Sequence, residues 1–336
     1  MQNKHFIEID LAKGFAIILA VFGHAAPDAV KGFYIIGTDS LSAQLHYLIY
    51  SFHMPLFFAC SGFLLYPKIY HNEGQVYKRF KKLMIPYFFL SFVYLCAKLI
   101  GEELADNPLT ENPIIGIFFG KSPCFGAWFL WVLFVMTFIV LSLRKVRLEI
   151  LLIVFISISY LPIDYADNYF GIAKVQANIT WLVLGCLTRQ YYEFIEKKIN
   201  LLIGVTAAFI LITIHVYSHM IPVVNHLVMH SVSLIKTLSG ITASFALCYL
   251  LAKNKPNSLI SRHFKLCSEY CMDIYIISMF VLVPMRILYV NVGLVNYIPY
   301  YIWLMIATLL GVIIPIYVSK YFIRKTKVLK LVLLGG

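Results

Sequence analysis

Residues 9 to 26 read IDLAKGFAIILAVFGHAA, a hydrophobic run that nevertheless carries Asp10, Lys13 and His24. About 20 consecutive apolar residues form a helix that crosses the hydrocarbon of a bilayer, and this run is nearly that long. Ionisable side chains are costly inside a membrane and usually serve a function there. The stretch therefore predicts a membrane helix with a functional site on it.

The rest of the chain repeats the hydrophobic character of this run. Its 336 residues are 61% hydrophobic and only 13% charged, and the mean hydropathy is +0.81, unlike a soluble domain. The apolar runs do not alternate with polar residues as membrane barrel strands do. We therefore predict an all-α integral membrane protein with one domain over residues 1–336. Its ten transmembrane helices are expected near residues 10–27, 45–66, 83–100, 127–143, 148–163, 175–190, 199–217, 231–252, 268–290 and 298–322.

The positions of Lys and Arg predict the orientation of these helices, because basic connectors stay on the cytoplasmic side. Basic residues gather in alternate connectors, including 68–82, 144–147, 253–265 and 320–330. Both termini are therefore predicted to be cytoplasmic, and the acidic loop at 101–113 is predicted to face outward. The net charge of +12 follows from this topology, so we expect membrane lipids and no nucleic acid as partners. The first helix lacks a small-residue cleavage site, and we expect the protein to retain it.

The three ionisable residues of the first helix share one face. Lys13 and His24 are eleven residues apart, which is about three helical turns and roughly 16 Å along the axis. Asp10, three residues before Lys13, joins the same stripe. Snorkelling of Lys13 to the interface and a helix-to-helix hydrogen bond of His24 are the structural alternatives. Their occurrence on one face favours a function at two membrane depths.

The second helix contains SFHMPLFFACSGFLL, residues 51 to 65. Pro55 removes a backbone hydrogen bond, so we expect a kink and a carbonyl left available inside the protein. His53 lies two residues earlier, at a depth comparable with that of His24, and is a second candidate functional residue. Ser61 and Gly62 are more simply explained by close helix packing.

A basic cluster, YKRFKKLMIPYFF, occupies residues 77 to 89 at the start of the third helix. Anionic lipid headgroups would attract these cations in any cytoplasmic connector. The same cations also fit the phosphates of a nucleotide donor, which charge-assisted hydrogen bonds hold well. Charge alone leaves both interpretations open.

Four segments together resemble a known family. DLAKGFAIILAVFGH (10–24), FHMPLFFACSGFLL (52–65), KRFKKLMIPYFF (78–89) and AWFLWVLF (127–134) are similar, in order and spacing, to the signature of the membrane acyltransferases called acyltransferase three. The most specific element is a basic residue, ten intervening positions and a histidine in the first helix. The family usually has arginine where this chain has Lys13, and two arginines three apart where it has Arg79 and Lys82. Both changes keep the charge but lose the planar fork of the guanidinium.

The resemblance implies a ten-helix enzyme of the bacterial inner membrane that O-acetylates a cell-envelope sugar or lipid-linked glycan with acetyl-CoA. It implies that His24 is a base or a transient acyl carrier and that Lys13 and Asp10 fix the entry geometry. His53 becomes a second base or an orienting partner. The remaining assignments are Arg79, Lys82, Lys78 and Ser61 at the CoA donor and Trp128 at the acceptor, with no metal expected.

Two other classes of protein stay open. A secondary transporter also has many helices, buried ionisable residues and a proline-kinked helix, although the two halves show no inverted repeat of broken helices. A metal-dependent hydrolase is suggested by two histidine pairs at helical spacing, His215 with His219 and His226 with His230. No acidic residue accompanies these pairs, which favours an interfacial cluster.

Overall fold

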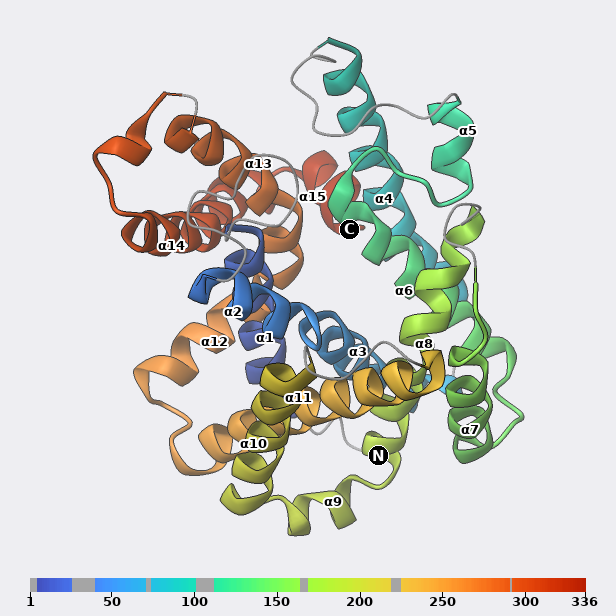
Figure 1. Cartoon of the computed structure of the whole chain (residues 1–336). Helices are drawn as coiled ribbons and strands as arrows, with labels where there is room; N and C mark the ends of the chain where they lie inside the picture. The colour runs from blue at the N-terminus through green and yellow to red at the C-terminus, as the bar shows by residue number, and fades with distance from the viewer. Residues whose placement is uncertain are drawn as a thin grey trace. The chain divides into compact units, whose positions relative to one another are not determined.

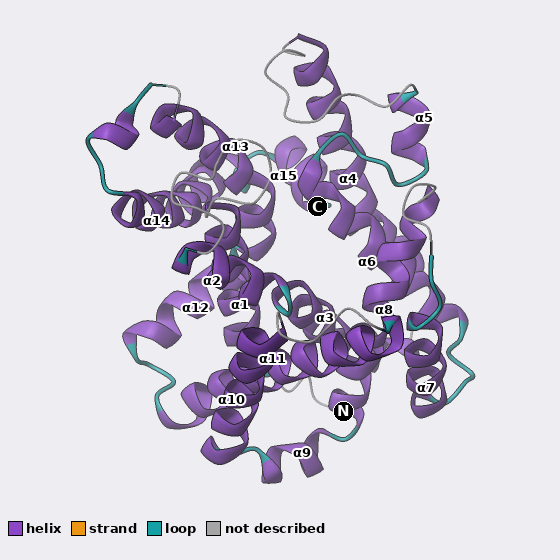
Figure 2. Cartoon of the chain, viewed as in Figure 1, coloured by secondary structure: helices purple, strands orange, loops and turns teal. Residues whose placement is uncertain are grey.

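The computed structural model describes residues 5–25, 40–70, 74–100, 112–163, 169–218, 225–290 and 292–336. Figure 2 shows that these residues form helices and loops, with no strand among them. The all-α prediction is thus confirmed for the part of the chain that the structure describes. Each of the ten predicted hydrophobic segments contains a helix.

The helices fall into two compact units, each built from separate stretches of the chain. The first unit comprises residues 1–60 and 191–317, and the second comprises 61–190 and 318–336. The single-domain prediction is not tested by this division and stays a prediction. In the first unit (Figure 1) are α1 (Ile7–Ala25), α2 (Leu41–Tyr50), the start of α3 (His53–Ile69), α9 (Tyr192–Lys198), α10 (Leu201–Tyr217), α11 (His226–Asn254), α12 (Leu259–Glu269), α13 (Cys271–Val290), the 3-10 turn Leu294–Asn296 and nearly all of α14 (Tyr300–Val318).

The second unit contains the remaining helices. They are the rest of α3, α4 (Gln75–Ile100), α5 (Pro113–Phe118), α6 (Trp128–Ser142), α7 (Leu148–Ser159), α8 (Ile172–Gln190) and α15 (Lys327–Leu334), with 3-10 turns at Phe125–Ala127 and Tyr169–Gly171 and a π-helical turn at Ser319–Ile323.

Five helices of the described residues are long and apolar enough to cross a membrane: Leu41–Ile69 (α2 and α3 together), Gln75–Leu99, His226–Asn254, Cys271–Val290 and Tyr300–Ile323. Helices α9 and α10, which meet at an angle of 87°, would form a sixth span if they are counted together. Helices α6 and α7 are apolar but shorter. Helix α1 is not among the five, because it contains three charged residues, Glu8, Asp10 and Lys13. The predicted number of ten spans and the cytoplasmic termini stay predictions.

The break between α2 and α3 explains how the chain accommodates Pro55. Ser51 and Phe52 form a turn, and Pro55 follows in the first turn of α3, where a missing N–H is tolerated. The carbonyl that Pro55 leaves without its helical donor is that of Ser51, four residues earlier. Thr237 of α11 donates its hydroxyl hydrogen to this carbonyl at 2.9 Å. The available carbonyl was therefore predicted correctly, whereas the bend is a turn placed before Pro55.

Close backbone contacts fix one helix pair in each unit. In the first unit, a Cβ at Gly14 of α1 would lie 1.9 Å from the carbonyl oxygen of Phe264 in α12. In the second, a Cβ at Gly62 of α3 would lie 1.9 Å from the carbonyl oxygen of Leu182 in α8. Only glycine allows backbones to approach this closely. The packing role predicted for Gly62 is confirmed.

Candidate active site

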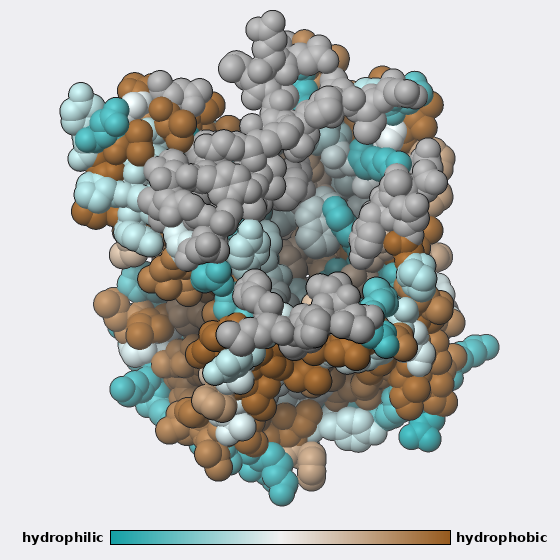
Figure 3. Space-filling view, in the orientation of Figure 1, coloured by the Kyte–Doolittle hydropathy of each residue, from teal (hydrophilic) through white to brown (hydrophobic). Residues whose placement is uncertain are grey.

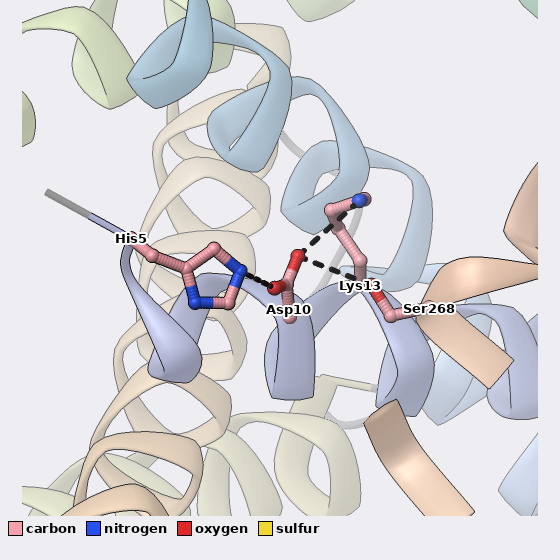
Figure 4. A network of polar contacts seen from close by, with 4 residues as sticks. All are labelled: His5, Asp10, Lys13 and Ser268. Carbon is pink, nitrogen blue, oxygen red and sulfur yellow. Dashed lines mark hydrogen bonds and ion pairs between the residues drawn. The ribbon is translucent and has the colours of Figure 1, made fainter. Parts of the chain in front are cut away.

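One end of α1 carries a network of charged and polar side chains around Asp10 (Figure 4). The Lys13 ammonium lies 3.6 Å from Asp10 Oδ1, and His5 Nε2 lies 2.7 Å from Asp10 Oδ2. Ser268, which comes from α12, donates its hydroxyl hydrogen to Asp10 Oδ1 at 3.4 Å. The side chains of Lys13 and Asp10 are 27% and 29% exposed, so this pair is only partly shielded from solvent. The sequence prediction that Asp10 accompanies Lys13 is confirmed.

The other end of α1 carries a cluster of histidine and tyrosine rings. His24 Nδ1 and the Tyr50 hydroxyl oxygen are 3.0 Å apart. The Tyr50 ring stacks on the buried ring of His46, with centroids 3.9 Å apart and planes 27° from parallel. His46 Nδ1 in turn lies 3.0 Å from the carbonyl oxygen of Gly23, next to His24 in α1. Tyr50 and His46 therefore hold His24 against α2.

His53 belongs to the same ring cluster. It is buried at the start of α3, and its ring centroid lies 4.8 Å from that of Tyr50. The structure thus brings His24 and His53 to one tyrosine ring, as their predicted depths required. His46 and Tyr50 were not among the predicted site residues. A signal for them existed, because residues 46, 50 and 53 follow the spacing that places side chains on one helical face.

The hydrogen bonds define which nitrogen of two histidines carries hydrogen. A carbonyl oxygen only accepts, so Nδ1 of His46 must donate to Gly23, and Nδ1 of His53 must donate to Ile49 at 3.0 Å. For His24 the partner is a hydroxyl, which can donate or accept. If Nε2 of His24 takes a proton from a substrate, its Nδ1 carries hydrogen and donates to Tyr50.

The predicted donor-binding cations lie in the second unit. Arg79 is half-buried in α4, near Cys186 of α8, whereas Lys78 and Lys82 are exposed. Ser61 is half-buried in α3, beside the Gly62 contact with α8. A pocket opens at the start of α4, and its lining residues are Ile69, Gly74, Gln75, Val76, Leu141, Ser142 and Arg144. Arg144 adds a cation to the end of the unit that carries Arg79.

Trp128, the predicted acceptor residue, begins α6 in the second unit. The Lys174 ammonium of α8 lies 4.7 Å from the centroid of its ring. One turn further along α6, Trp131 Nε1 donates to the carbonyl oxygen of Phe170 at 2.9 Å. Phe170 has a left-handed backbone with φ of 59°, which is unfavourable for a bulky residue. Such strain persists only where surrounding contacts enforce it, so the chain at the contact of Trp131 with Phe170 is held in a defined shape.

The histidines considered as metal ligands are arranged differently. His215 Nδ1 lies 3.0 Å from the Lys236 ammonium, and His226 stacks on His230 with centroids 6.1 Å apart. His219 lies outside the described residues. Within the described ranges, no group of three or more His, Cys, Asp or Glu side chains is arranged to hold a metal ion. The described residues therefore give no support to the alternative of a metal-dependent hydrolase.

The apolar helices are consistent with a membrane protein, and the family match of the chain makes it a membrane acyltransferase. Residues 6–317 match the model of a family described as an acyltransferase domain, and the chain belongs to this acyltransferase-three family. The family membership also favours an enzyme over the transporter alternative.

Two curated relatives are similar over part of the chain. Nodulation protein NolL of Sinorhizobium fredii is 31% identical over 133 residues, covering 38% of this chain and 34% of NolL. Nodulation protein NolL of Mesorhizobium japonicum is 30% identical over 146 residues, covering 40% and 34%. The match thus spans about a third of the length of each relative. No solved structure matches the chain.

Proposed function

We propose that the protein is an O-acetyltransferase of the bacterial inner membrane, which moves an acetyl group from cytoplasmic acetyl-CoA to a hydroxyl of a cell-envelope sugar or lipid-linked glycan. Membership of an acyltransferase family supports the reaction class. The observation that carries the proposal is the contact between His24 and Tyr50 at one end of α1, with the Asp10–Lys13 pair on the same helix. This arrangement supplies an oriented base on a rigid element.

His24 is the proposed general base. Acetyl-CoA supplies an acetyl thioester. As the acceptor oxygen bonds to the acetyl carbon, His24 Nε2 takes the hydroxyl hydrogen, and Nδ1–H donates to the Tyr50 oxygen. The bond between carbon and sulfur breaks, and the imidazolium returns the proton to the departing sulfur. His53, whose ring also contacts Tyr50, is the proposed orienting partner of this ring.

Arg79, Lys82 and Lys78 are proposed to bind the phosphates of the donor, with Ser61 nearby in the same unit. A guanidinium or ammonium holds phosphate oxygens by charge-assisted hydrogen bonds, and each such contact is worth about 1.5 to 3 kcal/mol. Half-burial of Arg79 limits competition from water for its contacts. Trp128 is proposed to contact the acceptor, because an aromatic ring presents a flat apolar face with a polar edge.

Arg79→Gln tests the donor site. We expect the apparent constant for acetyl-CoA to rise about tenfold or more while the acceptor constant stays unchanged, and the difference from wild type should shrink at high salt. Lys145→Gln is the matched control, because it removes one exposed cation from another basic connector of the second unit. If the apparent constant for acetyl-CoA is equal in Arg79→Gln and Lys145→Gln, the cations around Arg79 set the orientation of the helices and do not bind the donor.

The reaction itself is tested with purified protein in vesicles, labelled acetyl-CoA and a panel of envelope glycans. We expect label to appear in a glycan as an ester that mild base removes. Arg79→Gln protein at low donor concentration should show reduced labelling of the same glycan. Uptake of an unmodified solute with no covalent product would contradict the proposal and favour a transporter.

A further inference from the structure

The length of helix α12 and its neighbours in the chain place it, by inference, at a membrane surface. It connects α11 and α13, which are both long and apolar enough to cross the bilayer. With 11 residues, α12 is about 16 Å long and too short to cross a second time. It therefore runs along the interface where α11 ends and α13 begins.

The two faces of α12 differ in chemistry. Ser261, Cys267 and Ser268 are buried on its inner face. On the outward face, Leu259 is 71% exposed and Leu266 is 41% exposed, with the exposed cation Arg262 between them. The other basic residues of this face and the preceding turn are Lys255, His263 and Lys265, and Glu269 at the end of α12 is the one acid of the helix. Apolar side chains mixed with cations are typical of a helix that lies in the headgroup region of a bilayer.

The inner face of α12 touches the charged end of α1 at three points. The carbonyl oxygen of Phe264 occupies the space beside Gly14, and the rings of Phe15 and Phe264 have centroids 5.5 Å apart. Ser268 donates to the Asp10 carboxylate (Figure 4). A displacement of α12 would therefore move a partner of Asp10, and Asp10 in turn pairs with Lys13.

We propose that the outward face of α12 is a docking surface for anionic lipid headgroups, and that these lipids hold α12 against α1 around Asp10. Charge complementarity selects the occupant: the cations of this face attract anionic headgroups over zwitterionic ones. Leu259 and Leu266 enter the acyl boundary and set the depth of the helix. A dependence of acetyl transfer on anionic lipid follows as a consequence, and only this consequence rests on the proposed function.

Amide hydrogen exchange of the full chain in nanodiscs tests both parts of the inference without measuring activity. Phosphatidylcholine nanodiscs are compared with nanodiscs that also contain phosphatidylglycerol. We expect phosphatidylglycerol to slow exchange severalfold in α12 and in residues 7–14 of α1, and to leave α9 unchanged. The Lys255→Gln/Arg262→Gln variant should lose this response, because each cation near an anionic surface contributes roughly a fivefold gain in binding. Lys197→Gln/Lys198→Gln in α9, with the same change in net charge, should keep it.

The exchange of α12 tests the docking of lipid, and the exchange of α1 tests the coupling between the two helices. Equal exchange of α12 in both kinds of nanodisc would overturn the docking surface, and slower exchange in α12 with no change in α1 would overturn the coupling. Acetyl transfer in the same nanodiscs should rise severalfold with phosphatidylglycerol for the wild type and the α9 control, and stay flat for Lys255→Gln/Arg262→Gln. Lipid-dependent protection of both helices without acetyl transfer in any lipid would support the docking surface and contradict the proposed function instead.

Discussion

The two ends of α1 carry polar groups of opposite character. Around Asp10 the contacts are between charged groups that remain partly exposed, and they include Ser268 of α12, the helix proposed to lie at the membrane surface. Around His24 the contacts are a hydrogen bond to a phenol and a stack of buried rings. The His24 ring thus contacts a neutral hydroxyl, that of Tyr50. In the proposed function, the Asp10 end serves positioning and the His24 end serves proton transfer.

The packing around the whole helix supports this division within the first unit. Helix α1 contacts α2, α11, α12 and α13, and Phe22 and Ala25 on either side of His24 pack against the cluster of Tyr289, Tyr300 and Leu304. Helix α10, by contrast, exposes large apolar side chains such as Phe209 and Ile212, and Figure 3 shows hydrophobic surface where α10 and α11 lie. Helix α1 packs against other helices of the first unit, whereas α10 presents the surface expected to face lipid.

The largest effect is expected from His24→Ala. Removal of a general base lowers a reaction rate by about 10²- to 10⁴-fold, so acetyl transfer should fall by that amount while membrane insertion and thermal stability stay close to wild type. His226→Ala is the control, because His226 is an exposed histidine at the start of α11. Full activity in folded His24→Ala protein would remove the chemical role from this end of α1.

Gly14→Ala tests the close contact between α1 and α12 near Asp10. The new methyl would meet the backbone of Phe264, which cannot move without displacing α12. We expect a loss of about 1 to 3 kcal/mol in the free energy of unfolding, as overpacking usually causes, together with reduced transfer. The measurement is thermal unfolding of the protein in detergent.

Gly204→Ala provides the matched control for this substitution. Its Cβ would lie 3.1 Å from Ala246 Cβ across the α10–α11 contact, which needs only a small adjustment. Alanine also favours a helix over glycine by about 1 kcal/mol, so Gly204→Ala should be close to neutral. Equal stabilities of the two variants would show that the contact of α1 with α12 is not tightly fixed.

A smaller effect is expected from Tyr50→Phe, which tests the neutral end. The variant keeps the ring that stacks on His46 and removes only the hydroxyl that contacts His24. A hydrogen bond of this kind contributes about 0.5 to 1.5 kcal/mol, so kcat should fall about two- to tenfold while KM for acetyl-CoA stays unchanged. Tyr47→Phe, at a neighbouring and more exposed position, should leave kcat unaltered. A change in KM alone would mean that Tyr50 serves binding and does not orient the base.

Long apolar runs made most of the helices predictable, but the breaks between helices were not. The predicted segment 45–66 is interrupted by the turn at Ser51 and Phe52, because the chain must accommodate Pro55. The predicted segment 268–290 begins too early, since α12 ends at Glu269 and α13 starts at Cys271. The sequence of α12 mixes polar and apolar residues, so continuous hydrophobicity does not reveal this helix.

The candidate site was predictable only where its residues are close in sequence or at matched depth. The Asp10–Lys13 pair follows from a spacing of three, and the approach of His24 and His53 follows from antiparallel neighbouring helices. Ser268 and Asp10 are separated by 258 positions, and the buried Glu8 accepts a hydrogen bond from Tyr192 over 184 positions. No local pattern encodes such partners, because packing of whole helices brings them together.

The smallest effect is expected from Lys13→Arg, which introduces the residue that is usual at this position in the family. The distance of 3.6 Å between Lys13 Nζ and Asp10 Oδ1 is long for a hydrogen bond, so the interaction is mainly one of charge. Arginine keeps that charge, and the partial exposure of both side chains leaves room for the larger guanidinium. Because part-exposed ion pairs contribute only about 0 to 1 kcal/mol, transfer should change by less than about threefold.

Lys13→Met provides the contrast, since it removes the charge and keeps most of the apolar stem. It should lower transfer more than Lys13→Arg does, because Asp10 then retains only His5 and Ser268 as the partners seen at this end of α1. Both variants are measured in the same glycan assay, with thermal unfolding as the check on folding. A loss in Lys13→Arg as large as that in His24→Ala would mean that the lysine amine itself takes part in the chemistry. The two ends of α1 would then both be reactive, and the division between positioning and proton transfer would have to be abandoned.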